Sequence, residues 1–473
     1  MGNPKGFMTV ARRDAGNRPI HERVADFGEV EQTLDEQERK LQASRCMDCG
    51  VPFCQWSCPV ANTMPEWQDA IYKGDWKLAI DVLHSTNNFP EFTGRICPAP
   101  CEKGCVLNIH KEPVTIRENE CATIEHAFDL GFVKPNPPKK RTGKKVAVIG
   151  SGPAGMAAAD LLNKWGHTVT LFEKDEAVGG LLRFGIPDFK LSKSVIDRRM
   201  DILTAEGLIV KTNVNVGVDI KAQDLMKEFD AVCIAIGAMK PRDLPVEGRE
   251  LKGVHYAMDF LTQQNRVVAG IEFAEEVRIH AKDKNVLVIG GGDTGSDCVG
   301  TSNRHKAKAV SQIEIMPKPP VDREGDNPWP YWPYVLKTST SHEEGCDRQW
   351  GLTTKRFIGE NGHVKEVEVI EVKWEKDPSG RQIMTEVAGS NKIIKADLVF
   401  LAMGFVHPVQ EGLVKDLGVE LDPRGNVKGD VDKKTSIEKI FVAGDATRGP
   451  SLVVHAIAEG RKMAASVDAF LRK

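Results

Sequence analysis

Cysteine is concentrated near one end of this 473-residue chain, because eight of its 11 cysteines lie between residues 46 and 121. The thiolate is the form of cysteine that attacks electrophiles and binds metals. In a reducing compartment such a dense group indicates metal binding or catalysis rather than disulfides. Seven of these cysteines fall into two groups, with the spacings C-x2-C-x4-C-x3-C-P and C-P-A-P-C-x3-C: Cys46, Cys49, Cys54 and Cys58, then Cys97, Cys101 and Cys105.

Iron–sulfur clusters explain these spacings better than zinc does. Structural zinc sites usually combine paired C-x2-C units into sets of four ligands, whereas the chain has one such unit and seven thiolates do not divide by four. Bacterial ferredoxins use C-x2-C-x2-C-x3-C-P, in which the last cysteine ligates the other cluster. The first group has this pattern with a longer middle gap and with Pro59 in place. We therefore expect two 4Fe–4S clusters, with Cys58 crossing to the second.

Two four-iron clusters need eight ligands, one more than the two groups supply. Cys121 and its neighbour Glu120 are the candidates for the eighth. Because thiolates are the usual ligands of such clusters, the residues alone favour Cys121.

A strand, a glycine-rich loop and a helix follow at residues 146–165. In the pattern G-x-G-x-x-G the first glycine makes the turn, the second admits a pyrophosphate and the third lets helix and strand pack closely. The pyrophosphate would lie at the helix N-terminus, where free N–H groups favour an anion. The next strand, 168–172, ends in an acid that can accept hydrogen bonds from a ribose. The expected contacts are Gly150, Ser151, Gly152, Pro153, Ala154, Gly155 and Glu173.

Later segments are expected to add cofactor contacts. The double glycine at 179–180 lets the backbone pass close to a cofactor, and Lys190 is either a pyrophosphate contact or a solvated side chain. A strand at 440–443 ends in Gly-Asp, where the aspartate can bond a ribityl or pyrophosphate oxygen, and the helix 451–470 could direct its N-terminus at a flavin. The further contacts are Gly180, Leu181, Arg183, Lys190, Val216, Gly404, Gly444 and Asp445.

The strand–loop–helix pattern occurs again at residues 285–304. Its next strand, 310–315, leads into Met316-Pro317-Lys318 and is expected to end without an acid, although Glu314 is two residues away. Without a carboxylate a 2′-phosphate is not repelled, so we expect NADPH rather than NADH, with Arg304 or Lys318 binding the phosphate. The expected contacts are Gly290, Gly291, Gly292, Asp293, Thr294, Gly295, Arg304 and Lys318.

Composition narrows the function classes. Hydrophobic residues at 41% and charged residues at 28% are typical of a globular protein, and the length predicts two to four domains. A net charge of −3 argues against a general nucleic-acid binder. Neither a membrane span, a secretory signal nor a lipid anchor is evident. We expect a cytoplasmic protein.

Residues 146–473, with two dinucleotide loops and a Gly-Asp strand end, resemble the two-domain flavin reductases of the glutathione- and thioredoxin-reductase class. The resemblance implies FAD on the first loop and a nicotinamide on the second. A redox-active cysteine pair is missing, because Cys233, Cys298 and Cys346 are isolated. Electrons must then leave through the N-terminal clusters.

The whole chain is similar to the small-subunit family of NADPH-dependent glutamate synthases and to the N-terminal part of dihydropyrimidine dehydrogenase. The motifs that carry this resemblance lie at residues 46–59, 95–101, 180–187, 291–298 and 341–346. In these relatives the second cluster takes three cysteines and one Gln or Glu, which implies Glu120 rather than Cys121. The implied sets are Cys46, Cys49, Cys54 and Cys105 for one cluster, and Cys58, Cys97, Cys101 and Glu120 for the other.

The resemblance implies an electron-input subunit. NADPH would reduce FAD, and electrons would pass through the clusters to the flavin of a separate large subunit that makes L-glutamate from L-glutamine and 2-oxoglutarate. No acid–base catalytic side chain is required. The alternatives are a subunit that feeds ferredoxin or a pyrimidine-reducing partner, or a non-catalytic scaffold.

The motifs predict an α/β protein with two Rossmann-like domains behind a helical iron–sulfur domain. In the helical part, a polar helix capped by Thr33 leads into the first cysteines, and residues 64–85 form one helix between the two groups. The Trp- and Pro-rich segment 326–350 is either a partner surface or a lid. We expect a cluster domain at 1–133, a solvated linker at 134–145, an FAD-binding domain at 146–250 and 396–473, and an inserted NADPH-binding domain at 251–395.

Overall fold

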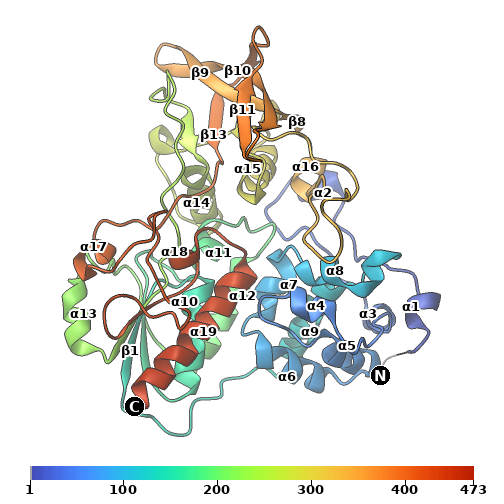
Figure 1. Cartoon of the computed structure of the whole chain (residues 1–473), viewed down its shortest axis with the longest axis vertical. Helices are drawn as coiled ribbons and strands as arrows, with labels where there is room; N and C mark the ends of the chain where they lie inside the picture. The colour runs from blue at the N-terminus through green and yellow to red at the C-terminus, as the bar shows by residue number, and fades with distance from the viewer. Residues whose placement is uncertain (1–2) are drawn as a thin grey trace.

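The cysteines lie in a part made of short helices (Figure 1), in a computed structural model that describes residues 3–473. The polar helix begins two residues later than predicted, because Asp35 rather than Thr33 caps it by accepting a hydrogen bond from Glu38 N. The helix predicted at 64–85 is interrupted where Gly74 adopts a φ of 77°. The helices are α1 (Gly6–Thr9), α2 (Ile20–Arg23), α3 (Glu36–Ala43), α4 (Phe53–Ser57), α5 (Met64–Lys73), α6 (Trp76–Thr86), α7 (Pro90–Ile96), α8 (Pro100–Gly104), η1 (Val106–Ile109) and α9 (Ile116–Asp129).

The first glycine-rich loop follows the central strand of a five-stranded parallel sheet with the order β14-β4-β1-β2-β3. Strands β1, β4 and β14 are almost wholly buried, which explains their continuous apolar sequences. Helices α10 and α19 pack closely at Gly460. A Cβ on this residue would lie 2.2 Å from Ala154 O, so only glycine fits without displacement. The elements of this part are β1 (Lys145–Ile149), α10 (Pro153–Lys164), β2 (Thr168–Phe172), α11 (Leu181–Phe184), α12 (Lys193–Ala205), β3 (Ile209–Lys211), α13 (Ala222–Glu228), β4 (Ala231–Ile234), α17 (Leu413–Leu417), β14 (Ile440–Val442), α18 (Asp445–Arg448) and α19 (Val453–Leu471).

The second loop follows the central strand of another parallel sheet, with the order β5-β13-β6-β7-β8. Strand β13 pairs with both β5 and β6, so residues 398–401 complete this sheet. The prediction that the FAD-binding segment resumes at residue 396 is therefore wrong by one strand. The elements are β5 (Val254–Tyr256), α14 (Ala257–Val268), η2 (Glu275–Val277), β6 (Asn285–Ile289), α15 (Asp293–Arg304), β7 (Ala309–Glu314), α16 (Thr340–Glu343), β8 (Asp347–Trp350) and β13 (Leu398–Leu401).

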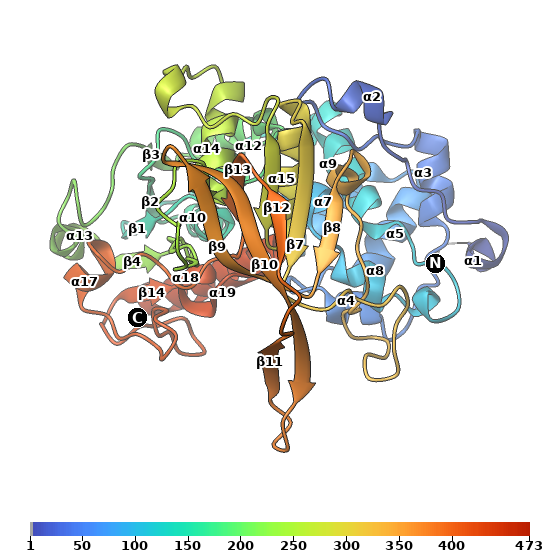
Figure 2. The same ribbon diagram turned by 90° about the horizontal axis from the view of Figure 1, so that it is seen from above.

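An antiparallel sheet covers one face of the second parallel sheet, with the β11 hairpin projecting from it (Figure 2). The alternating apolar residues of 351–394 pack inward: Val364, Val367 and Val369 share a core with Leu287 and Ile313. Its strands are β9 (Leu352–Glu360), β10 (His363–Lys376), β11 (Gln382–Glu386) and β12 (Lys392–Lys395).

The predicted linker at 134–145 is largely exposed, but it is anchored to the protein and not a free tether. Arg141 Nη1 donates to Asn163 Oδ1 and to His167 O, both at 2.7 Å, and Asn136 N donates to Glu206 Oε1 at 3.0 Å. These bonds fix the segment on the first parallel-sheet part. Within residues 3–473, no helix is long and apolar enough to cross a membrane.

Candidate cofactor-binding sites

The first implied cluster set lines one small apolar cavity. Cys46, Cys49, Cys54 and Cys105 all contribute to its wall, beside Leu107 and other apolar side chains. Burial raises the pKa of Cys46 to about 12, and the charges of Cys105 and Cys49 add to the shift. Because burial disfavours the thiolates, the ionised set needs a compensating positive charge. Ligated iron would supply that charge, so the residues fit a cluster.

The second implied set is buried more deeply. Burial raises the pKa of Cys97 to about 12, with the charges of Glu120 and Cys58 adding to it. Burial also raises the pKa of Cys101, and there the charges of Cys58, Cys97 and Glu120 contribute. These mutual effects indicate that the three thiols and the carboxylate lie near one another.

The neighbours Glu120 and Cys121 face different surroundings, since successive residues of a helix point about 100° apart. The Glu120 carboxylate accepts hydrogen bonds from Asn87 Nδ2 and Thr93 Oγ1, both at 2.8 Å. Burial raises its pKa to about 7, against these hydrogen bonds. Cys121 instead packs on α7, where a Cβ on Gly94 would lie 2.7 Å from its Cα. This geometry favours Glu120, as the resemblance implies.

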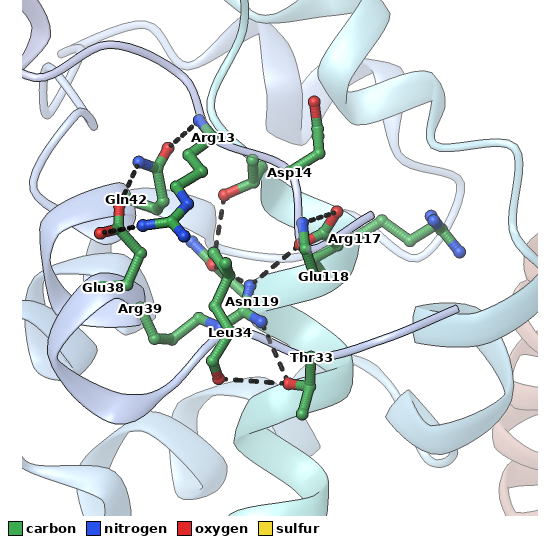
Figure 3. A network of polar contacts seen from close by, with 12 residues as sticks. Arg13, Asp14, Thr33, Leu34, Glu38, Arg39, Gln42, Arg117, Glu118 and Asn119 are labelled. Atoms are coloured by element: carbon green, nitrogen blue, oxygen red, sulfur yellow. Dashed lines mark hydrogen bonds and ion pairs between the residues drawn. The ribbon is translucent and has the colours of Figure 1, made fainter. Parts of the chain in front are cut away.

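Buried polar contacts fix α9, the helix that carries Glu120, against α3 and α5 (Figure 3). Arg39 Nη1 donates to Asn119 Oδ1 at 3.1 Å and to Glu118 Oε2 at 3.3 Å. Asn119 Nδ2 then donates to Gln68 Oε1 at 2.7 Å. The rotation of α9 about its axis is thereby set one residue before Glu120.

No three His, Cys, Asp or Glu side chains in residues 3–473 converge closely enough to hold one metal ion. The ligands of a four-iron cluster bind separate iron atoms, so they do not need to converge on a single point.

At the first loop, two glycines are needed for close packing and one leaves open space in which a ligand could lie. Gly150 has a φ of 97°, and a Cβ there would lie 2.4 Å from Ala235 O. A Cβ on Gly155 would lie 1.9 Å from Gly150 O, whereas one on Gly152 would meet no atom of the described chain within 4 Å. The N-terminus of α10, which includes Pro153 and Ala154, has no side-chain cap from residues 3–473. These features fit a pyrophosphate.

Other predicted contacts of the first site converge on this loop. Ser151 N donates to Glu173 Oε2 at 3.1 Å. A Cβ on Gly180 would lie 3.0 Å from Gly152 Cα, so the double glycine lies against the loop. A Cβ on Gly444 would lie 2.9 Å from the Cβ of Ala154, which brings Asp445 to the same helix N-terminus.

The second loop repeats this geometry. Gly290 has a φ of 120°, and a Cβ there would lie 2.2 Å from Ala402 O. A Cβ on Gly295 would lie 2.3 Å from Gly290 O, while the Cβ position of Gly292 is open among the described residues. Asp293 and Thr294 form the first turn of α15. No N-cap side chain in residues 3–473 accepts a hydrogen bond from the free N–H groups of this turn. This loop also fits a dinucleotide.

The prediction that the strand after the second loop ends without an acid is wrong. Strand β7 ends at Glu314, and its carboxyl group lies over Gly291, where a Cβ would be 1.7 Å from Glu314 Cδ. Ile315 and Met316, which look like strand residues in the sequence, are exposed. The predicted strand 310–315 includes one residue beyond the end of β7, so the prediction places Glu314 inside the strand and not at its end.

Arg304 is also misassigned as a phosphate ligand. It is the last residue of α15, roughly 16 Å along the helix from the loop, and its buried guanidinium forms hydrogen bonds of 2.6 and 3.1 Å with Glu344. Lys318 is exposed and lies 5.2 Å from the ring centroid of Trp350.

Arg348 is a candidate that the sequence analysis missed. Its Nη2 lies 3.7 Å from Glu314 Oε1, and its guanidinium lies 4.9 Å from the ring centroid of Trp350. Arg348 Nε is buried without a hydrogen-bond partner among the described residues. Only the pairing of β8 with β7 brings Arg348 near the second loop, and no local sequence pattern indicates it.

The remaining predicted contacts have varied surroundings. Arg183 is committed to Val178 O and Asp197 rather than directed at a loop. Val216 packs its side chain in the core. Lys190 is neither solvated nor free, because its Nζ lies 2.5 Å from Asp297 Oδ1. Leu181 starts α11, and Gly404, with a φ of 79°, follows β13 at a chain crossing.

All three parts of the molecule line one cavity of about 1200 Å³. Cys97 reaches it from the cluster part, Leu452 from the start of α19, and Asp293 from the start of α15. Lys190 and Asp297 form part of its wall. The second cluster set and the two nucleotide-binding parts therefore meet at one place.

Comparisons with known proteins agree with this division. The family model of pyridine nucleotide-disulphide oxidoreductases matches residues 144–460, and that of dihydropyrimidine dehydrogenase domain II, 4Fe-4S cluster, matches residues 23–131. The glutamate synthase [NADPH] small chain of Mycobacterium tuberculosis is 50% identical over 475 residues, which span 100% of this chain and 96% of the relative. The chain belongs to the glutamate synthase small-chain family. Its Bacillus subtilis relative is 46% identical, over 100% of this chain and 99% of the relative.

Members of the wider glutamate synthase family differ in the nicotinamide that their names carry. Glutamate synthase [NADH] of Saccharomyces cerevisiae is 46% identical over 99% of this chain, which spans 22% of that relative. Among solved structures, Mycobacterium tuberculosis FprA in complex with NADPH has a TM-score of 0.55 and 18% identity, over 70% of this chain and 85% of that chain. The expected fold, two dinucleotide-binding domains behind an iron–sulfur domain, is confirmed.

Proposed function

We propose that this small-chain family member is the electron-input subunit of a glutamate synthase. It oxidises NADPH and passes electrons through FAD and 4Fe–4S clusters to the flavin of a large subunit, which makes L-glutamate from L-glutamine and 2-oxoglutarate. One observation carries the proposal: Cys97 of a cluster set, Asp293 of the second dinucleotide loop and Leu452 at the start of α19 line one cavity in a chain 50% identical to a glutamate synthase small chain.

The residues divide the cofactors between the parts. Gly150–Gly155 with Glu173 would hold FAD, and Gly290–Gly295 would hold NADPH. When bound, FAD takes a hydride from NADPH and releases single electrons to iron–sulfur clusters. The chain itself binds and orients these groups and excludes water from the cavity. We assign no acid–base side chain.

One ion pair in the wall of the cavity has compensating charges. The Lys190–Asp297 pair is buried there, and Asp297 raises the pKa of Lys190 against the effect of burial. Because the two charges compensate each other, this pair adds little net field to a bound nicotinamide. Cys97, on the same wall, would place the second cluster beside the flavin.

We infer that NADPH is bound through Arg348 and Lys318. Glu314 stands where a ribose-binding acid is expected, and its charge would repel a 2′-phosphate. The guanidinium of Arg348 offsets that charge and retains an unpaired Nε. Arginine suits phosphate because its planar group donates several hydrogen bonds.

The proposed partner is the large subunit of glutamate synthase, in a hetero-oligomer, without nucleic acid or membrane. This rests on the relatives' designation as small chains. A cytoplasmic location is proposed because cluster-ligating thiols must stay reduced.

Anaerobic reduction by NADPH tests the proposal. The holoprotein should contain FAD, iron and sulfide, and NADPH should bleach its flavin within one turnover. Adding the matching large subunit should then produce NADPH-dependent glutamate synthesis. A flavin that NADPH does not bleach refutes the electron-input role. Bleaching without restored glutamate synthesis refutes the partner and favours another acceptor, such as ferredoxin.

A further inference from the structure

We propose that Arg23, which lies outside both nucleotide sites, locks the NADPH-binding part in the orientation that hydride transfer requires. Arg23 belongs to the arm, residues 17–31, which precedes the cysteines. Its partner is Glu344, just beyond α16. The inference rests on the proposed function, because it concerns the transfer from NADPH to FAD.

Arg23 is buried although it ends a helix of four residues near the N-terminus, and its relative exposure is 2%. Its Nε donates to Glu344 Oε1 at 2.9 Å. Its Nη2 donates to Thr340 O at 2.9 Å and to Glu343 Oε2 at 3.1 Å. Helices α2 and α16 lie side by side (Figure 1). Arg23 thus joins the arm to the NADPH-binding part through three hydrogen bonds.

Arg304 completes the lock from the other side of Glu344. It binds both carboxylate oxygens, at 2.6 and 3.1 Å, and its Nε donates to Asp26 O of the arm at 3.0 Å. Its guanidinium also lies 3.7 Å from the ring centroid of Phe189, in the FAD-binding part. One buried arginine therefore contacts all three parts of the molecule.

The lock acts on the side of the interface that lacks a covalent connection. Two chain crossings, marked by the bridge between Pro241 and Phe405, join the nucleotide-binding parts. Helix α14 adds hydrogen bonds, in which Thr262 Oγ1 donates to Phe184 O at 3.0 Å and Asn265 Nδ2 donates to Ile186 O at 3.0 Å. Crossings and α14 alone leave a hinge. The Lys190–Asp297 ion pair and the attachment through the arm together restrict rotation about it.

Helix α16 transmits the lock to the cavity. Its C-terminal end is held by Arg23. Its N-cap, Ser339, lines the cavity and lies within hydrogen-bond distance of Ser296 on α15, with their Oγ atoms 2.6 Å apart. Because α15 starts at the second loop, a displacement of α16 would shift the bound NADPH relative to FAD.

Removing Arg23 is the mildest way to open the lock. Loss of Glu344 would leave two buried arginines without their shared anion, which destabilises a fold strongly. Arg23→Met leaves the Arg304–Glu344 pair intact, and methionine fills much of the space of the arginine stem. Arg23→Lys keeps the charge but cannot bond Glu344, Thr340 and Glu343 together.

The test is the stopped-flow rate of flavin bleaching in the holoprotein at saturating NADPH. We expect Arg23→Met to lower the limiting rate about tenfold or more, since misplacement by an ångström suffices for such a loss. The NADPH concentration at half-maximal rate should change little, and Arg23→Lys should recover part of the rate. Dithionite should reduce all variants fully.

Arg13→Gln is the matched control. Arg13 precedes the arm in the same extended N-terminal segment, is largely exposed, and pairs at 3.1 Å with Glu38, within the cluster part. Its loss should leave the bleaching rate unchanged. Without nucleotide, hydrogen–deuterium exchange at 340–345 and at 23–26 should accelerate in Arg23→Met but not in Arg13→Gln.

The outcomes separate this inference from the proposed function. Wild-type flavin that NADPH cannot bleach refutes the proposed function itself. A wild-type flavin that is bleached, together with an Arg23→Met variant of equal rate and equal exchange, refutes the lock. If Arg23→Met loses FAD or iron, Arg23→Lys decides, because a wild-type rate and wild-type exchange in that variant also refute the lock.

Discussion

Glu173 and Glu314 occupy equivalent positions in the two parallel sheets. Glu173 follows Phe172, whose backbone oxygen accepts from Gly150 N at 2.8 Å, and Glu314 follows Ile313, whose oxygen accepts from Gly290 N at 2.9 Å. Their partners differ, because Ser151 N donates to Glu173 whereas Glu314 faces the guanidinium of Arg348. The two nucleotide sites are therefore distinguished by the neighbour of the acid and not by its presence.

Arg348 should decide between the two nicotinamide nucleotides. Arg348→Met removes a hydrogen-bonding cation, and such bonds contribute roughly 1.5–3 kcal/mol, so the apparent Kd for NADPH should rise about 10- to 100-fold. Affinity for NADH should change much less. Titration of the oxidised protein with each nucleotide measures both. Arg356→Met, at an exposed ion pair with Glu368 on the covering sheet, is the control. Equal losses for both nucleotides would contradict the assignment.

Glu120 should be required for one cluster, and Cys121 for neither. Because Glu120 shares its surroundings with Cys58, Cys97 and Cys101, Glu120→Ala should lower iron from about eight to about four per chain. Low-temperature electron paramagnetic resonance of the reduced protein should then lose one signal. Cys121→Ala should keep both iron and spectrum, although it removes a buried thiol from the same helix. The reverse result would make Cys121 the ligand.

The glycine loops and the cysteine groups were predictable because their chemistry is local. Gly150 and Gly290 need positive φ, and Gly155 and Gly295 need close packing, wherever the loop lies in a fold. The spacing of the cysteine ligands can likewise be recognised along the chain without a three-dimensional structure. The assignment of Glu120 as the eighth cluster ligand is different. The residues alone favour Cys121, and only the resemblance and the packing of Cys121 against Gly94 favour Glu120.

The features predicted wrongly from the sequence depend on contacts between segments that are far apart in the chain. The end of β7 is set by its register with β6, and the apolar Ile315 and Met316 concealed it. Strand β13 resembles β4 in sequence because both are buried parallel strands, so nothing local assigns it to the second sheet. Nothing in the sequence shows that Arg304 is already engaged. In the folded protein its guanidinium binds Asp26 O of the arm and Glu344.

Two alanine substitutions should separate packing from cofactor binding at the first loop. Gly152→Ala places a Cβ in open space, so the chain should fold, but the methyl group should weaken FAD binding by about tenfold or more. Gly155→Ala drives a Cβ to 1.9 Å from Gly150 O, so the thermal midpoint should fall even without FAD. Flavin titration and thermal denaturation of the flavin-free protein measure the two effects. A Gly152→Ala variant that binds FAD normally would contradict the site.

His342 should make the NADPH-binding part sensitive to acid. Its Nε2 lies 2.8 Å from Gln312 Oε1, and Gln312 Nε2 donates to Gly290 O at 2.9 Å, so the imidazole supports the second loop. Burial lowers the pKa of His342 from 6.5 to about 4. The unfolded chain therefore binds more protons than the folded one between these values, and stability should fall as the pH drops from 6.5 toward 4.

His342→Gln should remove part of this dependence, because glutamine does not titrate. We expect the thermal midpoint of wild type to fall more steeply between pH 7 and pH 5 than that of the variant. The two pKa values alone correspond to roughly 2 kcal/mol in the free energy of unfolding at pH 5, and solvent screening of the half-buried imidazole reduces the expected difference to roughly 1 kcal/mol. Hydrogen exchange at 285–295 should report the same loss locally. His363→Gln, at the exposed first residue of β10, serves as the control and should follow wild type. Parallel curves for all three proteins would show that His342 does not carry the acid sensitivity.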